Sequence, residues 1–136
     1  MVRRLDHRMV TTHPPARDGL RLDFEARLLL VPPATRLRTS MGPGTVRIEG
    51  HLSTGSRGWR LEGAVARHRN RLDLFVRARR ADPGAGEGIE DHAYAAVLGP
   101  LRAGRWRLRV RHLFGPADGD GVAEPLTVLE ETIVVE

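Results

Sequence analysis

A row of arginines marks the stretch of this chain with the clearest capacity for binding chemistry. Every second residue from 105 to 111 is an arginine: Arg105, Arg107, Arg109 and Arg111. The residues between these arginines are apolar. A guanidinium group donates paired N–H bonds to phosphate, sulfate or carboxylate oxygens. On an extended strand such a row lies on one face at a spacing of about 6 to 7 Å, which suits a polyanion. Arg77 and Arg79 extend this surface if their strand lies in the same sheet.

A second interpretation makes the same arginines the solvated outer face of a sheet. Carboxylates on other predicted strands are then their cross-strand partners: Asp23, Glu25, Glu49, Glu62 and Asp73. The chain contains no lysine, so an arginine at any one site carries little information. Nucleic-acid-binding sheets usually add stacking aromatics. Most aromatic residues of this chain fall at predicted inward positions. Phe75 is the exception, because it falls on the charged side of its strand. There it either stacks on a base or a partner, or fills an edge between the sheets.

Six histidines invite a metal interpretation, because neutral imidazole is a good ligand for zinc and copper. No two of them stand in a short His-x-His or His-x-x-x-His spacing. A site would need histidines from different strands to converge, with His92 and His112 as the best candidate pair, and two ligands bind a metal weakly without a third. The acidic run Asp118-Gly119-Asp120-Gly121 with Glu124 lacks the ligand pattern of a calcium loop and predicts a turn. We therefore expect neither a metal nor a cofactor.

Motifs for catalysis are lacking in the sequence. There is no nucleophile elbow, no phosphate-binding glycine loop and no carboxylate pair that stands out from surface charge. Ser40, Ser53 and Ser56 fall in predicted loops without an identifiable base. We expect the protein not to be an enzyme.

Composition limits the class of protein. The chain has 136 residues, 40% of them hydrophobic and 29% charged, with no apolar run long enough to span a membrane as a helix. With 22 basic and 17 acidic residues its formal net charge is +5, a modest value that is compatible with a polyanion partner without requiring one. The chain has no cysteine, so a disulfide framework and thiol chemistry are excluded. No apolar segment follows the basic start, which predicts a cytoplasmic protein.

Alternation of apolar and polar residues is the dominant pattern and predicts β-strands. It recurs in seven segments: 20–30, 46–52, 59–65, 71–79, 92–98, 105–111 and 126–135. The glycine-rich segment 82–88 predicts a loop, and a short turn over 32–38 is the only helical candidate. No longer window carries a helical apolar stripe. In the last segment the apolar parity changes at Glu130-Glu131, which predicts a β-bulge or two strands sharing the segment.

These strands predict an all-β fold, an antiparallel β-sandwich of about seven strands. Residues 20–136 would form this single domain. Residues 1–19 would form a flexible basic arm with Arg3, Arg4 and Arg8.

One segment resembles a known fold family. Leu98-Gly99-Pro100-Leu101, followed by Gly104-Arg105-Trp106-Arg107-Leu108-Arg109-Val110, resembles the late-strand signature of immunoglobulin-like and fibronectin-type-III-like domains. In that signature a tight turn with glycine leads into an aromatic-x-aliphatic-x-aliphatic strand. Those domains often carry a tyrosine on this strand, where this chain has Trp106, and antibody domains carry paired cysteines that are absent here. The resemblance implies the fold class and no catalytic residue; such domains commonly bind proteins or carbohydrates, or act as spacers.

The sequence therefore leads to two functional hypotheses. The first is a protein-interaction or structural module, self-associating or part of a larger assembly, with Ile133, Val134 and Val135 as an interaction edge. The second is a domain that binds a polyanion, either nucleic acid or acidic polysaccharide, through its arginine face. Neither hypothesis includes insertion into a membrane.

Overall fold

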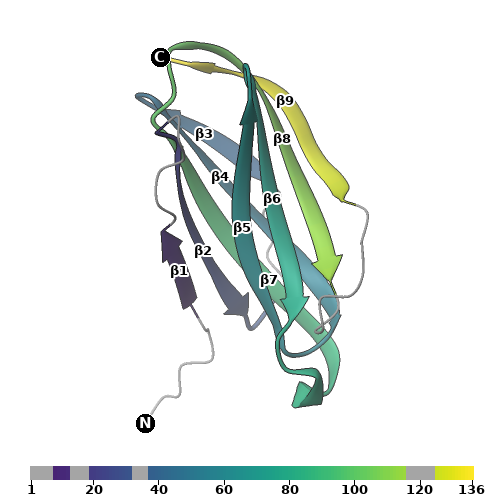
Figure 1. Ribbon diagram of the computed structural model, residues 1–136. Helices are drawn as coiled ribbons and strands as arrows, with labels where there is room; N and C mark the ends of the chain where they lie inside the picture. Colours follow the sequence, from purple (N-terminus) through teal and green to yellow (C-terminus); the bar gives the residue numbers. More distant parts are fainter. Residues whose placement is uncertain (1–7, 13–18, 32–36, 116–124) are drawn as a thin grey trace.

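Strands account for most of the residues that the computed structural model describes, which are 8–12, 19–31, 37–115 and 125–136 (Figure 1). In chain order they are β1 (Arg8–Thr12), β2 (Arg21–Leu29), β3 (Arg38–Gly42), β4 (Thr45–Ser56), β5 (Trp59–His68), β6 (Arg71–Arg80), β7 (Glu87–Gly99), β8 (Gly104–Gly115) and β9 (Leu126–Val135). A single turn of 3-10 helix, Pro83–Ala85, precedes β7. The prediction of an all-β protein is confirmed.

The strands form two sheets packed face to face. One sheet has the order β1-β2-β7-β4-β3 and the other the order β5-β6-β8-β9. In Figure 1 the β5-β6-β8-β9 sheet lies in front of the other and crosses it obliquely. The chain changes sheet between β4 and β5, between β6 and β7, and between β7 and β8. The turn between β7 and β8 contains a cis peptide bond at Gly99-Pro100.

Two strands were not expected from the apolar pattern. β1 lies within the segment predicted as an arm and pairs with β2, from Arg8 opposite Arg27 to Thr12 opposite Asp23. β3 pairs with β4 at the other edge of the same sheet. Its residues show no apolar alternation because an edge strand of this kind buries little of its surface. Arg3, Arg4, the acidic run at Asp118 and most of the predicted 32–38 turn lie outside the described residues.

One prediction about strand direction was wrong. Both sheets were expected to be antiparallel throughout, yet β6 and β8 run parallel, from Arg71 opposite Arg107 to Arg79 opposite Gly115. The reason is topological: β7 lies between them in sequence but belongs to the other sheet, so the chain returns to its starting end before β8 begins. The remaining strand pairs are antiparallel.

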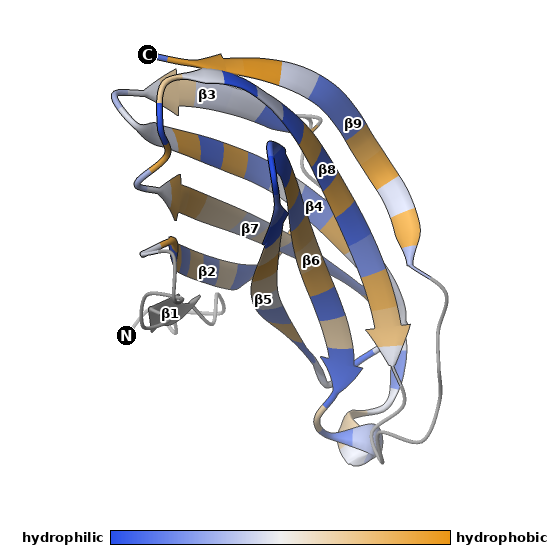
Figure 2. Cartoon of the chain, turned by 45° about the horizontal axis from the view of Figure 1, so that its top comes forward, coloured by the Kyte–Doolittle hydropathy of each residue, from blue (hydrophilic) through white to orange (hydrophobic). Residues whose placement is uncertain are grey.

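The core lies between the two sheets and follows the predicted parity. Figure 2 shows hydrophobic and hydrophilic bands alternating along the strands. The largest fully buried side chains include Trp106, Phe24, Ile48, Leu72 and Leu98. The sheets also contact each other at both flanks. β2 packs against β5 on one side, and on the other Thr39 of β3 donates a hydrogen bond of 2.5 Å to Glu131 of β9.

The predicted irregularity in the last strand is a β-bulge two residues earlier than expected. Val110 pairs with Leu129, but Arg111 pairs with Thr127, which leaves Val128 as the extra residue of β9. The bulge shifts the inward parity, so Leu126 before it and Ile133 after it both lie on the inner side of one continuous strand.

Candidate functional site

The arginines predicted as a binding surface lie on one face of the β5-β6-β8-β9 sheet. Trp106, Leu108 and Val110 of β8 are buried, so the alternating arginines of that strand point outward. Arg77 and Arg79 point to the same side from β6, the neighbouring strand. The parallel register places Arg77 beside Leu113 and Arg79 beside Gly115, below the row from Arg105 to Arg111. The six predicted arginines therefore share a face without forming a single line.

We call the outward residues of this sheet the basic face. Its charged members are eight arginines and three carboxylates: Arg60, Arg71, Arg77, Arg79, Arg105, Arg107, Arg109 and Arg111, with Glu62, Asp73 and Glu130. The surplus of five positive charges equals the formal net charge of +5 for the whole chain.

The outer face of the other sheet is balanced by comparison. The outward residues of β2, β3, β4 and β7 include four arginines and four carboxylates: Arg21, Arg27, Arg38 and Arg47, with Asp23, Glu25, Glu49 and Asp91. Glu49 accepts hydrogen bonds from Arg47 and Arg38, and the bond from Arg47 is the main reason that the pKa of Glu49 is lowered. Among the described residues of these two outer faces, the excess of positive charge therefore lies on the basic face.

Half of the arginines on the basic face are engaged by carboxylates of that face. Buried Asp73 accepts a hydrogen bond of 2.7 Å from Arg109 and lies 3.4 Å from the Nε of Arg71. The bond to Asp73 raises the pKa of Arg109. Arg107 lies 2.9 Å from Glu130. Arg79 and Glu62 form a looser pair at 3.8 Å. The predicted cross-strand pairing thus holds for Glu62 and Asp73 but not for the other three predicted carboxylates, which lie on the opposite sheet.

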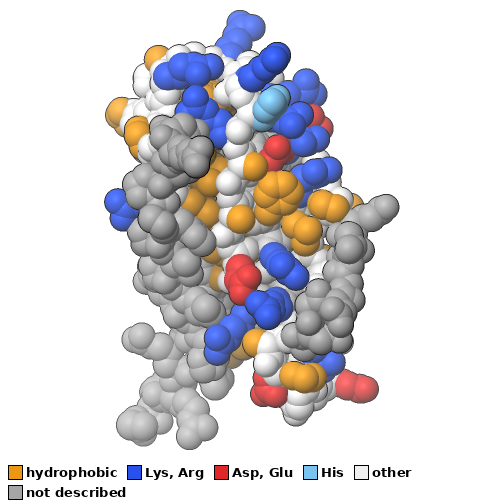
Figure 3. Space-filling model, viewed as in Figure 1, with side chains coloured by type: hydrophobic (Ala, Val, Ile, Leu, Met, Phe, Trp, Pro, Cys, Tyr) orange, Lys and Arg blue, Asp and Glu red, His pale blue; other side chains and the backbone are white. Residues whose placement is uncertain are grey.

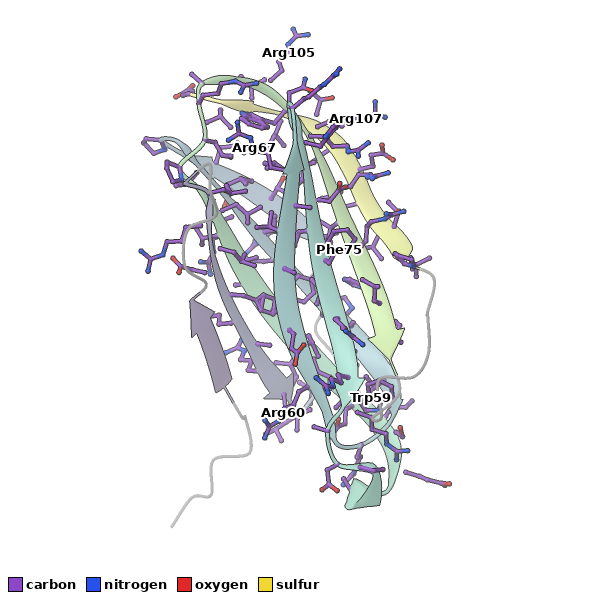
Figure 4. All side chains as sticks on the ribbon, in the orientation of Figure 1. Trp59, Arg60, Arg67, Phe75, Arg105 and Arg107 are labelled. Carbon is purple, nitrogen blue, oxygen red and sulfur yellow. The ribbon has the colours of Figure 1, made fainter. Side chains whose placement is uncertain are left out.

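Four arginines of the basic face form no ion pair within the described part of the chain: Arg60, Arg77, Arg105 and Arg111. Arg111 instead donates a hydrogen bond of 3.3 Å to the hydroxyl of Thr127. Arg105 lies at one end of the sheet and Arg60 at the other (Figure 4). Arg77 lies between them on β6, where its guanidinium approaches the backbone at Gly115. Available charge is therefore spread over the length of the face.

Apolar side chains occupy the middle of the basic face. Phe75 lies outward on β6, between Ala64 of β5 and Arg111 of β8, and Leu113 follows in the next row of β8. Figure 3 shows hydrophobic side chains gathered there, with arginines above and below them. We call Ala64, Phe75 and Leu113 the apolar centre. The sequence had singled out Phe75 by its parity, whereas Arg60, Arg71 and Leu113 became part of this surface only through the strand order.

The predicted interaction edge lies on β9, an outer strand of the same sheet. Its three residues divide between the two sides of the strand. Ile133 and Val135 are buried in the core, and Val134 is 58% exposed.

Histidine and tyrosine side chains are enclosed between the sheets. Tyr94 of β7 and His112 of β8 form a hydrogen bond of 2.7 Å that joins the two sheets through the core. Burial raises the pKa of Tyr94, and burial together with the charge of His51 lowers the pKa of His112 to about 4. His92 is held 3.3 Å from Glu90, and burial lowers its pKa. His92 and His112 thus bind different partners, Glu90 and Tyr94. The described residues contain no group of three histidine or acidic side chains placed to hold a metal ion.

Trp106 anchors the end of the β5-β6-β8-β9 sheet where Arg105 lies. Its ring is buried, and its indole N–H donates to the carbonyl oxygen of Arg102. The guanidinium carbons of Arg102 and Arg67 lie 4.8 and 5.4 Å from the ring centre. These cation–π contacts stabilise the end of the sandwich and give both arginines a structural role.

The described residues form no helix that is long and apolar enough to cross a membrane. Compared with known proteins, the chain matches no family model, no curated protein and no solved structure.

Proposed function

We propose that this protein is a non-catalytic binding module that docks an acidic protein surface on its basic face. The observation that carries the proposal is the composition of that face, with a surplus of five positive charges around an apolar centre. Energetic centres of protein interfaces are enriched in aromatic residues and arginine, and a polar rim surrounds them. Phe75 and Arg111, which are neighbours across β6 and β8, supply this combination.

The carboxylates of the face favour a protein over a uniform polyanion. Glu130 lies against Arg107, and Asp73 lies against Arg109, in the middle of the predicted arginine row. A phosphate or sulfate chain following β8 would meet these negative charges and would compete with them for the arginines. A folded protein surface can place its acidic groups at Arg60, Arg77 and Arg105 and an apolar group on Phe75.

Binding of a nucleic acid or an acidic polysaccharide is the second candidate. It is supported by the four outward arginines of β8, which stand at alternate positions of one strand. Phe75 would offer one stacking surface to a base. This candidate predicts affinity that falls steeply with salt and depends little on the apolar centre.

We also propose that the sandwich is related to immunoglobulin-like domains. Support comes from the two packed sheets and from Trp106, which is buried on β8 directly after the Gly99-Pro100 turn and Gly104. The parallel β6 and β8 pair departs from the antiparallel sheets that the resemblance implies. Comparison of this strand order with the strand orders of those domains tests the relation.

A titration with defined probes tests the proposed function. Labelled peptides that alternate Glu with Leu, polyglutamate of equal charge, single-stranded DNA and heparin fragments are titrated with the protein at about 50 and about 150 mM salt. We expect the Glu-Leu peptide to bind more tightly than polyglutamate. Phe75→Ser should weaken that binding by about tenfold or more, as for other central aromatic contacts.

Matched charge reversals identify the surface. Arg77→Glu and Arg105→Glu should weaken peptide binding, whereas Arg21→Glu, with the same change in net charge on the other sheet, should leave it nearly unchanged. Binding of DNA or heparin that survives Phe75→Ser and exceeds peptide binding would replace the proposal by the second candidate. Absence of binding to every probe at low salt would overturn both.

A further inference from the structure

β9 is an edge strand that lacks the usual protection against pairing with another chain. It is ten residues long and pairs only with β8 within the described part of the molecule, and it forms one rim of its sheet in Figure 1. Natural proteins shield such edges with short strands, basic side chains or proline. β1 and β3 have five residues each, and β5 carries Arg60 and Arg67. β9 contains no basic residue and no proline.

The two carboxylates of β9 are already engaged within the chain. Glu130 forms an ion pair with Arg107, and Glu131 points inward to accept the hydrogen bond from Thr39. They do not act as free charges that would repel an incoming strand. Two apolar side chains of β9 are exposed to solvent: Leu126 is 61% exposed and Val134 is 58% exposed.

We propose that β9 pairs antiparallel with β9 of a second copy of this chain, so that two four-stranded sheets join into one. Two identical strands that continue each other's sheet with the same side outward are related by a two-fold axis perpendicular to the sheet. Paired residues then have the same parity, since side chains alternate between the two sides of a strand. The axis must therefore pass level with a residue of β9.

Any residue of β9 satisfies this geometry, and the opposed pairs that an axis at Thr132 creates are the reason for choosing it. An axis at Thr132 places it opposite its own copy, and Thr–Thr pairs are favourable across strands. Glu130 then lies opposite Val134 of the second copy, and Leu129 lies opposite Val135. An axis at Glu131 would place that carboxylate opposite itself. The Thr132 register is therefore free of directly opposed carboxylates.

A second copy also suits the charge of the sheet. The outward side of β9 carries no arginine, so the seam between two copies would separate the arginines of one basic face from those of the other. Half-buried Leu129 would gain cover from Val135 of the second copy along the inner side of the seam. The basic faces of both copies would remain open on one side of the joined sheet.

Light scattering on the full chain tests the association. At about 100 µM, where an interface of micromolar Kd is mostly formed, we expect a mass twice the 15.1 kDa of one chain. Val134→Glu should give a monomer, because the new carboxylate would oppose Glu130 of the second copy. In its own chain that position lies beside Arg105, which favours folding of the variant. His68→Glu, on β5 at the opposite edge and beside Arg71, should remain a dimer.

Crosslinking tests the register in an independent way. The natural chain has no cysteine, so Thr132→Cys introduces one thiol per chain. Directly opposed Cβ atoms of paired strands lie about 4.5 to 5.5 Å apart, and the shorter of these separations approaches disulfide reach. We expect oxidation to yield a covalent dimer from Thr132→Cys and none from Ala66→Cys on β5. A monomeric natural chain, or a dimer that persists in Val134→Glu without crosslinking at Thr132→Cys, overturns the proposal.

Discussion

At the scale of single residues, the burial of His112 between the sheets makes the stability of the fold depend on pH. Burial and the charge of His51 hold the pKa of His112 at about 4, below its usual 6.5. Between these two values the unfolded chain binds a proton at this position and the folded chain does not. The free energy of unfolding therefore falls as the pH falls from 6.5 to about 4, by up to about 3 kcal/mol at this site.

Substitution of His112 isolates this contribution. His112→Gln replaces the imidazole by a neutral amide that can still accept a hydrogen bond from Tyr94, so urea unfolding should vary less between pH 6.5 and 4. Part of the slope should remain, because burial lowers the pKa of His92 in the same direction. His68→Gln, at an exposed position, serves as the control and should keep the natural slope. Equal slopes in both variants would show that His112 does not control the acid response.

Asp73 should contribute more to stability than any exposed carboxylate on the same face. It is buried and binds both Arg109 and Arg71, so its neutralisation leaves two guanidinium groups without their partner. We expect Asp73→Asn to lower the free energy of unfolding by about 1 to 3 kcal/mol. Glu62→Gln, in the exposed pair with Arg79, removes the same charge and should stay within about 0.5 kcal/mol of the natural protein. Chemical denaturation of both variants decides this, and equal losses would contradict it.

At the scale of elements, Gly63 determines how closely β5 approaches β2. A Cβ atom at Gly63 would lie 2.6 Å from ring atoms of Phe24, at the flank where the two sheets meet. Gly63→Ala should therefore overpack the core and cost about 1 to 3 kcal/mol. A Cβ atom at Gly55 of β4 meets nothing within 4 Å, so Gly55→Ala should be neutral or slightly stabilising. Thermal unfolding of the pair measures the difference, and equal melting temperatures would show that the flank can relax.

Elements were predictable wherever one side of a strand fills the core. The alternation along β2, β6 and β8 is imposed by burial, and it identified those strands and their outward residues from the sequence. β3 lacked this signal because it buries little. The segment 82–88 was predicted as a loop from its glycines and the next strand only from His92, but β7 begins at Glu87. Glu90, before the predicted start, accepts a hydrogen bond from the backbone of Trp59 and bonds to His92 inside the fold. Local sequence does not record such contacts between distant segments.

At the scale of the whole molecule, the strand order turns a modest net charge into an asymmetric one. The sequence identified the arginine row of β8 and the outward position of Phe75. It could not show that β6 is the neighbour of β8, or that Asp23, Glu25 and Glu49 belong to the other sheet. Pairing between sheets cannot be read from parity, because both sheets alternate in the same way. The charge surplus on the basic face is therefore a property of the topology.

This asymmetry predicts how the protein binds to a charged surface. Retention on a cation exchanger depends on the protein face that contacts the resin. The electrostatic attraction at that face is set by the charges within about a Debye length of the resin surface. Arg77→Glu with Arg105→Glu should elute at a clearly lower salt concentration than Arg21→Glu with Arg27→Glu, although both double variants have the same net charge. Circular dichroism establishes that both remain folded. Elution at one salt concentration would mean that net charge alone governs binding, and the basic face would then have no advantage over the balanced face in attracting an acidic partner.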